Sequence, residues 1–158
     1  MGKPRLTAAV RRGVRVEIRY SLRLPRDAVT VPLVRTICRD AMNRLGVTLD
    51  CQGDVALALT EACANVVQHA GGDENEYEVQ IEFAGGTCHI RVLDQGRGID
   101  LRDSGRTETI LDQDSGRGIV LMRLMADRIA FESRPEDGTI VHLQKHLELE
   151  ENALLAAL

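Results

Sequence analysis

The segment from about Gly53 to Ala70 is apolar on almost every side, and it constrains the fold more than any other part of the chain. A pattern of this kind predicts a helix buried within the fold. Glu61, Asn65 and His69 nevertheless follow one another at four-residue steps, so they share one face of this helix. A carboxylate among alanines and valines is costly unless it is paired or hydrated. The stripe therefore predicts a cleft, a metal ion or a protein network against this face, with a salt-bridged or capped Glu61 as the purely structural alternative.

The spacing of apolar residues predicts the other elements. Strands are expected over Val14–Leu24, Glu78–Ala84, Thr87–Leu93, Arg128–Ser133 and Thr139–His146, and further helices over Val29–Leu45 and Ile119–Met125. Gly46 is expected to stop the first helix, and Gly85-Gly86 to form a hairpin turn. This order predicts an α+β fold, with helices on one face of a mixed, mostly antiparallel sheet.

The chain length of 158 residues predicts one domain, which we place at residues 14–147. A loose basic tail is expected before it, over residues 1–13. The tail after it, residues 148–158, follows Leu147 and carries leucines on overlapping helical faces, which indicates an amphipathic helix.

Composition excludes several kinds of partner. With a formal charge of −4, 3% aromatic residues and no Trp, the chain offers neither the basic field nor the stacking surface of a nucleic-acid binder. The sequence has no apolar run of about 18 residues and no signal-peptide pattern, so we expect a cytoplasmic protein with no membrane contact. The spacing of the cysteines fits no CxxC motif, which predicts reduced, buried thiols at Cys38, Cys51, Cys63 and Cys88.

Three glycine-containing segments follow expected strands or open expected elements. Asp94–Gly98 reads DQGRG at the end of an apolar strand, and Ser115–Gly118 reads SGRG at the start of a helix. Glycines at a helix start let a ligand approach the backbone, whose free N–H groups suit an anion such as phosphate. Gly138-Thr139 opens the last strand. Each segment alone is also consistent with a plain turn or helix start.

Taken in order, the pattern E-x3-N-x3-H, DxGxG, GxG and GT resembles the nucleotide-binding motifs of the Bergerat (GHKL, histidine-kinase-like) ATPase superfamily. Within it, TEACANVVQHA, SGRGIVLMRLMADRI and SRPEDGTIVHLQKHL resemble the anti-sigma-factor serine/threonine-protein kinases. The resemblance covers roughly Val14 to Leu147. It implies the Bergerat two-layer α/β sandwich, with ATP and Mg²⁺ as cofactors.

The resemblance also implies roles for individual residues. Glu61 would act as general base, and Asn65 would hold Mg²⁺ through its amide oxygen. Asp94 would accept a hydrogen bond from the adenine amino group, supported by Thr139. The glycine-rich loops would fold over the ligand and the helix start would meet the phosphates, through Gly96, Gly98, Ser115, Gly116, Arg117 and Gly118.

Asp114 departs from the pattern, because the family members often have an arginine at this point. Arg117, Arg106 or Arg102 are candidates to supply the missing cation. The departure favours an alternative to the kinase: a catalytically weak, nucleotide-dependent binding module that regulates a partner protein. A histidine-kinase catalytic domain fits less well, since no histidine precedes His69.

The function that the resemblance implies is a serine kinase acting as an anti-sigma factor. Such a protein sequesters a sigma factor and phosphorylates a small anti-sigma antagonist protein. We also expect a homodimer, formed through the edge strand Val14–Leu22 or the helix Val29–Leu45, because unpaired strand edges are natural contact surfaces.

Overall fold

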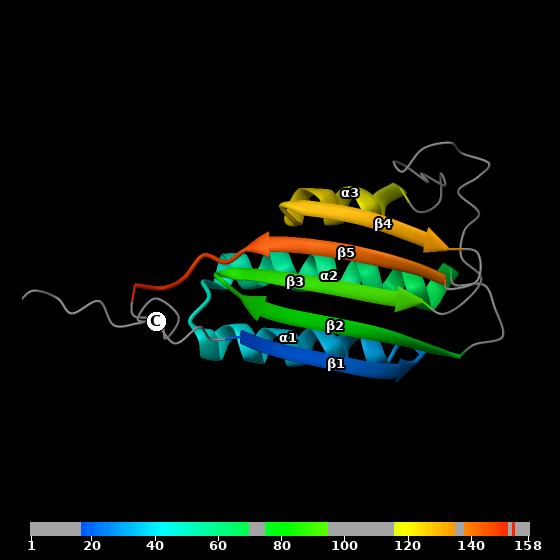
Figure 1. Cartoon of the computed structure of the whole chain (residues 1–158), viewed down its shortest axis with the longest axis horizontal. Coiled ribbons are helices and arrows are strands. Elements are labelled where there is room, and N and C mark those ends of the chain that lie inside the picture. The colour runs from blue at the N-terminus through cyan, green and yellow to red at the C-terminus, as the bar shows by residue number, and fades with distance from the viewer. Residues whose placement is uncertain (1–16, 70–74, 95–115, 135–137, 152, 154–158) are drawn as a thin grey trace, which may run out of the picture.

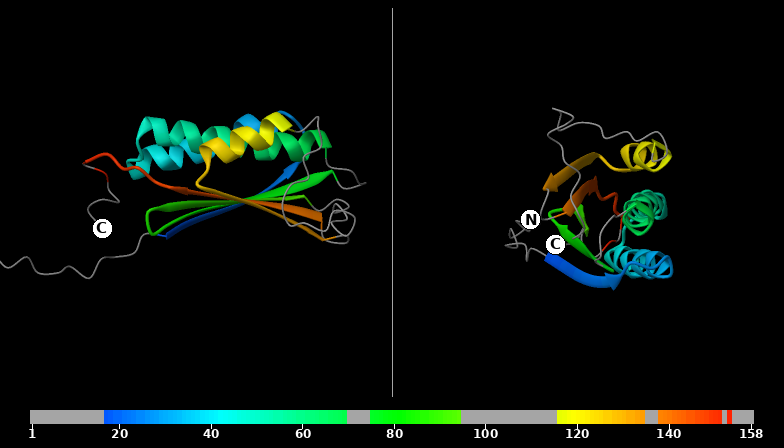
Figure 2. Two further views of the ribbon diagram at one scale, coloured as in Figure 1. Left: turned by 90° about the horizontal axis from the view of Figure 1, so that it is seen from above. Right: turned by 90° about the vertical axis from the view of Figure 1, so that its right-hand side faces the viewer.

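The computed structural model describes residues 17–69, 75–94, 116–134, 138–151 and 153. Within these residues the chain forms strands β1 (Glu17–Pro25), β2 (Glu76–Ala84), β3 (Thr87–Asp94), β4 (Arg128–Arg134) and β5 (Gly138–His146), and helices α1 (Thr30–Leu45), α2 (Leu49–His69) and α3 (Gly116–Met125). The strands join in one sheet in the order β1-β2-β3-β5-β4, and the helices lie side by side on one face of it (Figure 1 and Figure 2). This is the two-layer α+β sandwich that the sequence predicts.

The strand pairs among the described strands are all antiparallel, in agreement with the expected α+β fold and its mostly antiparallel sheet. The tight hairpin between β2 and β3 can only join antiparallel partners, whereas helices intervene along the chain between β1 and β2 and between β3 and β5. Gly85 and Gly86 link β2 to β3 with φ values of 57° and 74°. These left-handed values are the ones that a two-residue hairpin turn requires, and glycine adopts them without strain.

Alternation along the central strands decides which face the helices cover. In β2 the side chains of Tyr77, Val79, Ile81 and Phe83 are almost completely buried, whereas the residues between them are partly exposed. Successive side chains of a strand point to opposite faces, so this one strand gives the sheet an apolar inner face and a polar outer face.

The helices complete the core. α1 is amphipathic, buries Val34, Cys38 and Met42 against the sheet, and ends at Gly46, whose φ of 79° forms a left-handed cap. α2 lies between α1 and α3 (Figure 2), which explains why its sequence is apolar on nearly all sides. The four cysteines all fall within the described residues and are buried and free, as predicted: Cys38, Cys51, Cys63 and Cys88.

The segment after β5 does not form the expected helix over residues 147–151. It runs extended beside the α1–α2 turn instead, where the Thr48 amide donates to the Glu148 carbonyl (2.8 Å) and the Glu150 amide donates to the Gly46 carbonyl (2.8 Å). Leu147 is buried and Leu149 is partly buried, while the glutamates between and after them are exposed. This period of two is that of extended chain. Residues 154–158 lie outside the described residues, as do the expected basic tail and the first residues of the first strand.

None of the helices within the described residues combines the length and the apolar character needed to cross a membrane.

Candidate functional site

One rung of the sheet brings two of the predicted site residues together. Tyr77 on β2 pairs with Asp94 on β3, and Asp94 pairs in turn with Thr139 on β5. Directly paired residues of an antiparallel sheet point to the same face. Since Tyr77 and Asp94 are buried, this is the face that the helices cover. The side chains of Asp94 and Thr139 are therefore neighbours on the inner face, although 45 positions of sequence separate them.

The carboxylate of Asp94 forms an ion pair with Arg26, which is not among the predicted site residues. Nη2 of Arg26 lies 2.5 Å from Oδ1 of Asp94, and the two side chains are 10% and 9% exposed. Arg26 follows β1 directly and is 68 residues away in sequence. No local pattern could have indicated this pairing; the only signal is that a buried carboxylate requires a partner.

A second group of predicted residues meets where α3 begins. A Cβ atom placed on Gly118 would stand 3.0 Å from Oε2 of Glu61 and 3.3 Å from Oδ1 of Asn65. The first turn of α3 therefore touches the carboxylate and the amide of the polar stripe on α2. A glycine permits this approach because it has no side chain. Among the described residues, a glycine at the start of α3 therefore stands directly against Glu61 and Asn65 of the predicted stripe.

Both groups lie at the same end of the molecule. In Figure 1 the right-hand end contains the end of β3, the start of β5, the end of α2 and the start of α3. The first turn of α3 also lies at this end, and the backbone N–H groups of a helix's first turn form a natural anion site. The arrangement offers an acid and an amide beside an anion-binding helix start, with a second acid deeper under the helices.

Several predicted residues are not placed by the structure. Gly96, Gly98 and Ser115 lie outside the described residues, as do Asp114 and its candidate replacements Arg102 and Arg106. Gly116 and Arg117 are the first residues of α3, and the Arg117 side chain is exposed. His69 is the last residue of α2.

Tyr77 is buried beside Asp94 on the neighbouring strand. Its hydroxyl lies 2.7 Å from Oγ1 of Thr30, at the start of α1. Burial raises the pKa of Tyr77 to about 12, against the opposing effect of the hydrogen bond with Thr30. The phenol is therefore neutral at physiological pH and acts as a fixed hydrogen-bonding group.

The oxygen atoms at the stripe suit a magnesium ion shared with phosphates. Mg²⁺ prefers hard oxygen ligands and in nucleotide sites uses one or two protein ligands together with phosphate oxygens and water. Glu61 and Asn65 offer this kind of set. Among the described residues no group of three or more His, Cys, Asp and Glu is arranged to hold a metal ion. An ion that needs phosphate oxygens to complete its coordination is compatible with that finding.

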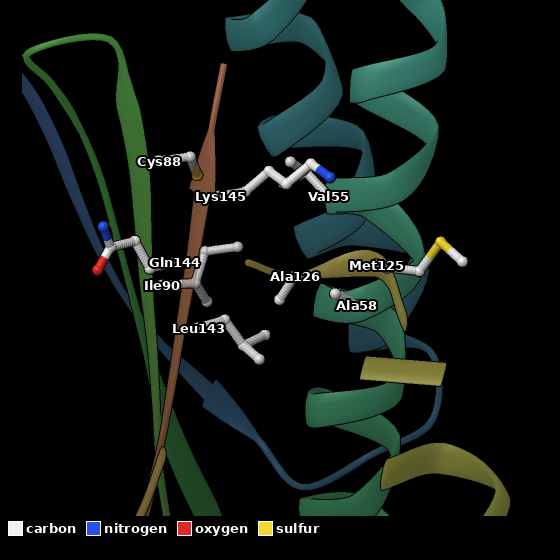
Figure 3. A pocket seen from close by; sticks show the side chains of 9 residues that line it. All are labelled: Val55, Ala58, Cys88, Ile90, Met125, Ala126, Leu143, Gln144 and Lys145. Carbon is white, nitrogen blue, oxygen red and sulfur yellow. The ribbon is translucent and has the colours of Figure 1, made fainter. Parts of the chain in front are cut away.

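The pocket drawn in Figure 3 is a different feature. Its lining includes Val55 and Ala58 on α2 and Leu143 and Lys145 on β5, toward the opposite end of α2 from Asn65. The cavity measures ≈ 10 Å³, which is room for about one water molecule. It is a packing gap in an apolar interior and is too small for a nucleotide.

The family described as "Histidine kinase-like ATPase domain" matches residues 24–145. The serine-protein kinase RsbW of Bacillus velezensis is 32% identical over 136 residues, which cover 80% of this chain and 84% of that protein. The RsbW of Bacillus subtilis is 28% identical over 136 residues, with 80% and 84% covered.

The fold comparison agrees. The crystal structure of the RsbU and RsbW domains of a Mycobacterium tuberculosis protein superposes with a TM-score of 0.65 at 17% identity, covering 82% of this chain. The matched part is 32% of that longer chain. The chain described here belongs to the histidine kinase-like ATPase family, within the group of serine-protein kinases that includes RsbW.

Proposed function

We propose that this protein is an ATP-dependent serine kinase that acts as an anti-sigma factor in the cytoplasm. In this proposal it sequesters a sigma factor in one state and phosphorylates a small anti-sigma antagonist protein in another. The observation that carries the proposal is the contact of Glu61 and Asn65 with Gly118, because it places an acid and an amide at a helix start suited to phosphate. The similarity to the RsbW kinases over 80% of the chain supports the same conclusion.

Phosphoryl transfer needs little covalent help from a protein, because most of its catalysis is positioning and charge stabilisation. Glu61 would accept the proton of the attacking serine hydroxyl as general base. Asn65 would hold Mg²⁺ through its amide oxygen, and the ion supplies charge neutralisation at the phosphates when it is bound. The backbone N–H groups at the start of α3 would bind phosphate oxygens, beside Gly116, Arg117 and Gly118.

The other end of the nucleotide would lie over the sheet. Asp94 would accept a hydrogen bond from the amino group of adenine, with Thr139 beside it on the next strand. Gly96, Gly98 and Ser115, in the glycine-rich loops, would enclose the phosphates. These roles follow the family resemblance, and the adjacency of Asp94 and Thr139 supports the first of them.

Partner contact is proposed at the β1–α1 side. β1 is an edge strand of the described sheet, and an unpaired edge is a template for another chain. At the start of α1, Val29 and Leu33 are 71% and 50% exposed. Apolar side chains on an accessible helix next to a free strand edge suit a protein partner. We propose this surface for the homodimer and for the sigma factor.

The decisive experiment combines ATP binding with transfer. The protein is incubated with γ-labelled ATP, Mg²⁺ and a small serine-bearing antagonist protein from the same source, and phosphoserine is measured on the antagonist. The Glu61→Gln variant should bind ATP within about threefold of wild type, because it keeps the shape of the site, and should lose transfer by about 100-fold or more. Asp50→Asn is the matched control, since it changes an exposed acid in the first turn of the same helix.

The outcomes separate the two candidate functions. A labelled antagonist that disappears with Glu61→Gln and persists with Asp50→Asn supports the kinase. Tight ATP binding without phosphoserine would favour the nucleotide-dependent binding module, for which the acidic residue Asp114 is the supporting observation. Failure of wild-type protein to bind ATP would reject both.

A further inference from the structure

The ion pair between Arg26 and Asp94 is unusual for its burial. Arginine and aspartate side chains are seldom so enclosed unless they are paired, and here about nine-tenths of each is removed from solvent. The pair of Lys145 with Asp54 is more open, with 18% and 41% of the side chains accessible. Arg19 with Glu82, on the outer face of the same edge strand, has 69% and 35% of the side chains accessible. The Arg26 pair therefore belongs to the interior of the site.

Backbone hydrogen bonds fix the position of Arg26. Its amide donates to the carbonyl of Asn75 at 2.6 Å, which ties it to the start of β2. The next amide, of Asp27, donates back to the Pro25 carbonyl at 2.8 Å. The carboxylate of Asp27 accepts the amide of Val29 at 2.9 Å, close to the start of α1. Arg26 is thus held from both sides, and its guanidinium reaches Asp94 from a rigid support.

A carboxylate can accept hydrogen bonds from more than one donor. It has about four acceptor positions on its two oxygens, so an arginine and an amino group can bind the same carboxylate. An ionised carboxylate only accepts hydrogen bonds, and it therefore suits an amino group and repels a carbonyl oxygen. A residue that holds this carboxylate in place with a positive charge therefore also determines which edge of a base the site prefers.

We propose that Arg26 is a positioning residue for base recognition, which holds the Asp94 carboxylate so that it accepts the exocyclic amino group of an aminopurine nucleotide. The inference rests on the proposed function, because it requires that Asp94 meets the base of ATP. Arg26 itself acts through Asp94. Without the guanidinium, the buried carboxylate loses the ion pair that offsets its charge and turns toward other donors. The site then loses its selectivity for the amino group.

The test measures a ratio of affinities. ATP and purine riboside triphosphate, which lacks the amino group, are titrated into wild type, Arg26→Gln, Arg26→Lys and the control Arg19→Gln. Wild type and the control should prefer ATP by roughly tenfold to 100-fold, the range of a hydrogen bond to a charged group. Arg26→Gln should reduce this preference to about threefold or less, mainly by weakening ATP. Arg26→Lys, which keeps the charge without the planar fork, should recover part of it.

Kinetics provide a second readout. The base is remote from the transferred phosphoryl group, so its contacts stabilise the bound substrate and the transition state equally. Loss of these contacts therefore weakens ATP binding without slowing the chemical step. In Arg26→Gln the KM for ATP should rise by about tenfold, while kcat at saturating ATP stays within about threefold of wild type. A parallel fall of kcat would indicate general disruption of the site and would overturn the proposal.

The possible results are distinct. Wild-type protein that binds neither nucleotide contradicts the proposed function itself. Wild type that prefers ATP, with the same preference in Arg26→Gln, contradicts only this inference. If Arg26→Gln weakens the binding of both nucleotides equally, Arg26 has a purely structural role. If Arg26→Gln binds ATP more tightly than wild type, Arg26 competes with the base for Asp94. Both results overturn the proposal.

A folding failure of Arg26→Gln is covered by a second comparison. The double variant Arg26→Gln/Asp94→Asn removes both charges of the pair from the interior, and it is compared with Asp94→Asn alone. The proposal expects the same low preference for ATP in both, because Arg26 works through the carboxylate. A different preference for ATP in the double variant and in Asp94→Asn would show that Arg26 acts without the carboxylate, and it would overturn the proposal.

Discussion

Gly118 faces the carboxylate of Glu61 so closely that a single added carbon would stand 3.0 Å from Oε2. A contact of 3.0 Å is tighter than carbon and oxygen normally accept, and Asn65 borders the same position at 3.3 Å. The start of α3 and the polar stripe of α2 therefore depend on each other's shape.

Gly118→Ala should impair function while leaving the fold intact. The methyl group must displace the Glu61 carboxylate or shift α3, and a displacement of this kind in a catalytic group lowers the rate by tenfold or more, up to about 100-fold. Within a helix, alanine is favoured over glycine by about 1 kcal/mol, so stability should fall little or rise. ATP titration, phosphoserine formation and thermal unfolding measure these effects.

Gly53→Ala is the matched control for that substitution. Gly53 lies inside α2 and a Cβ there meets nothing within 4 Å. Transfer activity should be unchanged, and the free energy of unfolding should rise by about 0.5–1 kcal/mol. Equal losses of activity in the two variants would contradict the role given to the Gly118 contact.

Gly46→Ala should destabilise the fold strongly. The φ of Gly46 is 79°, and a Cβ there would stand 2.5 Å from the Cβ of Ala153. A left-handed alanine costs about 1–2 kcal/mol and overpacking adds about 1–3 kcal/mol, so we expect a loss of at least about 2 kcal/mol in urea unfolding. Gly85→Ala measures the cost of the left-handed backbone alone, because φ of Gly85 is 57° but a Cβ there would meet no atom within 4 Å. A cost no greater at Gly46 than at Gly85 would contradict the contact with the tail.

Tyr77 should make stability fall in alkali. Burial raises the pKa of this phenol to about 12, above its ordinary value of 10. The neutral form is favoured in the folded state, so its stabilising contribution is complete below pH 10 and is lost as pH rises from 10 to 12, where the unfolded chain binds fewer protons. Tyr77→Phe should flatten this part of the profile of unfolding free energy against pH. An unchanged slope in the variant would show that another group titrates there.

The cysteines should be inert in the native protein. Burial raises the pKa of Cys63 to about 12, against the opposing hydrogen bond with Tyr77, and burial also raises the pKa of Cys51. Since the thiolate is the reactive form, Ellman's reagent at pH 8 should find almost no thiols in the folded protein and all 4 in denaturant. Rapid reaction of one thiol in the native state would indicate local opening near that residue.

Much of the fold was predictable because its patterns are local. The alternation in β2 and the spacing in α1 are visible in any short window, and Gly46 and Gly85-Gly86 mark turns by their backbone freedom. The start of α2 was placed at Gly53, but the helix begins at Leu49. The signal was present in Thr48, whose hydroxyl accepts the Cys51 amide at 3.4 Å as a helix cap.

The site was predictable to the extent that its residues share an element. Glu61 and Asn65 lie on one helix face and could be grouped from their spacing. The Arg26–Asp94 pair spans two strands and 68 positions, and a single sequence contains no pattern that links such residues. The pairing of Asp94 with Thr139 likewise depends on β5 inserting between β3 and β4, which is a property of topology.

The extended segment after β5 affects how a working fragment of this protein should be cut. The family match ends at residue 145, yet Leu147 and Ala153 are buried, and the latter sits against Gly46. A shortened version ending at the family boundary would uncover the apolar turn between α1 and α2. Expression designs should therefore retain residues through at least 153 and attach any carrier or label beyond that point.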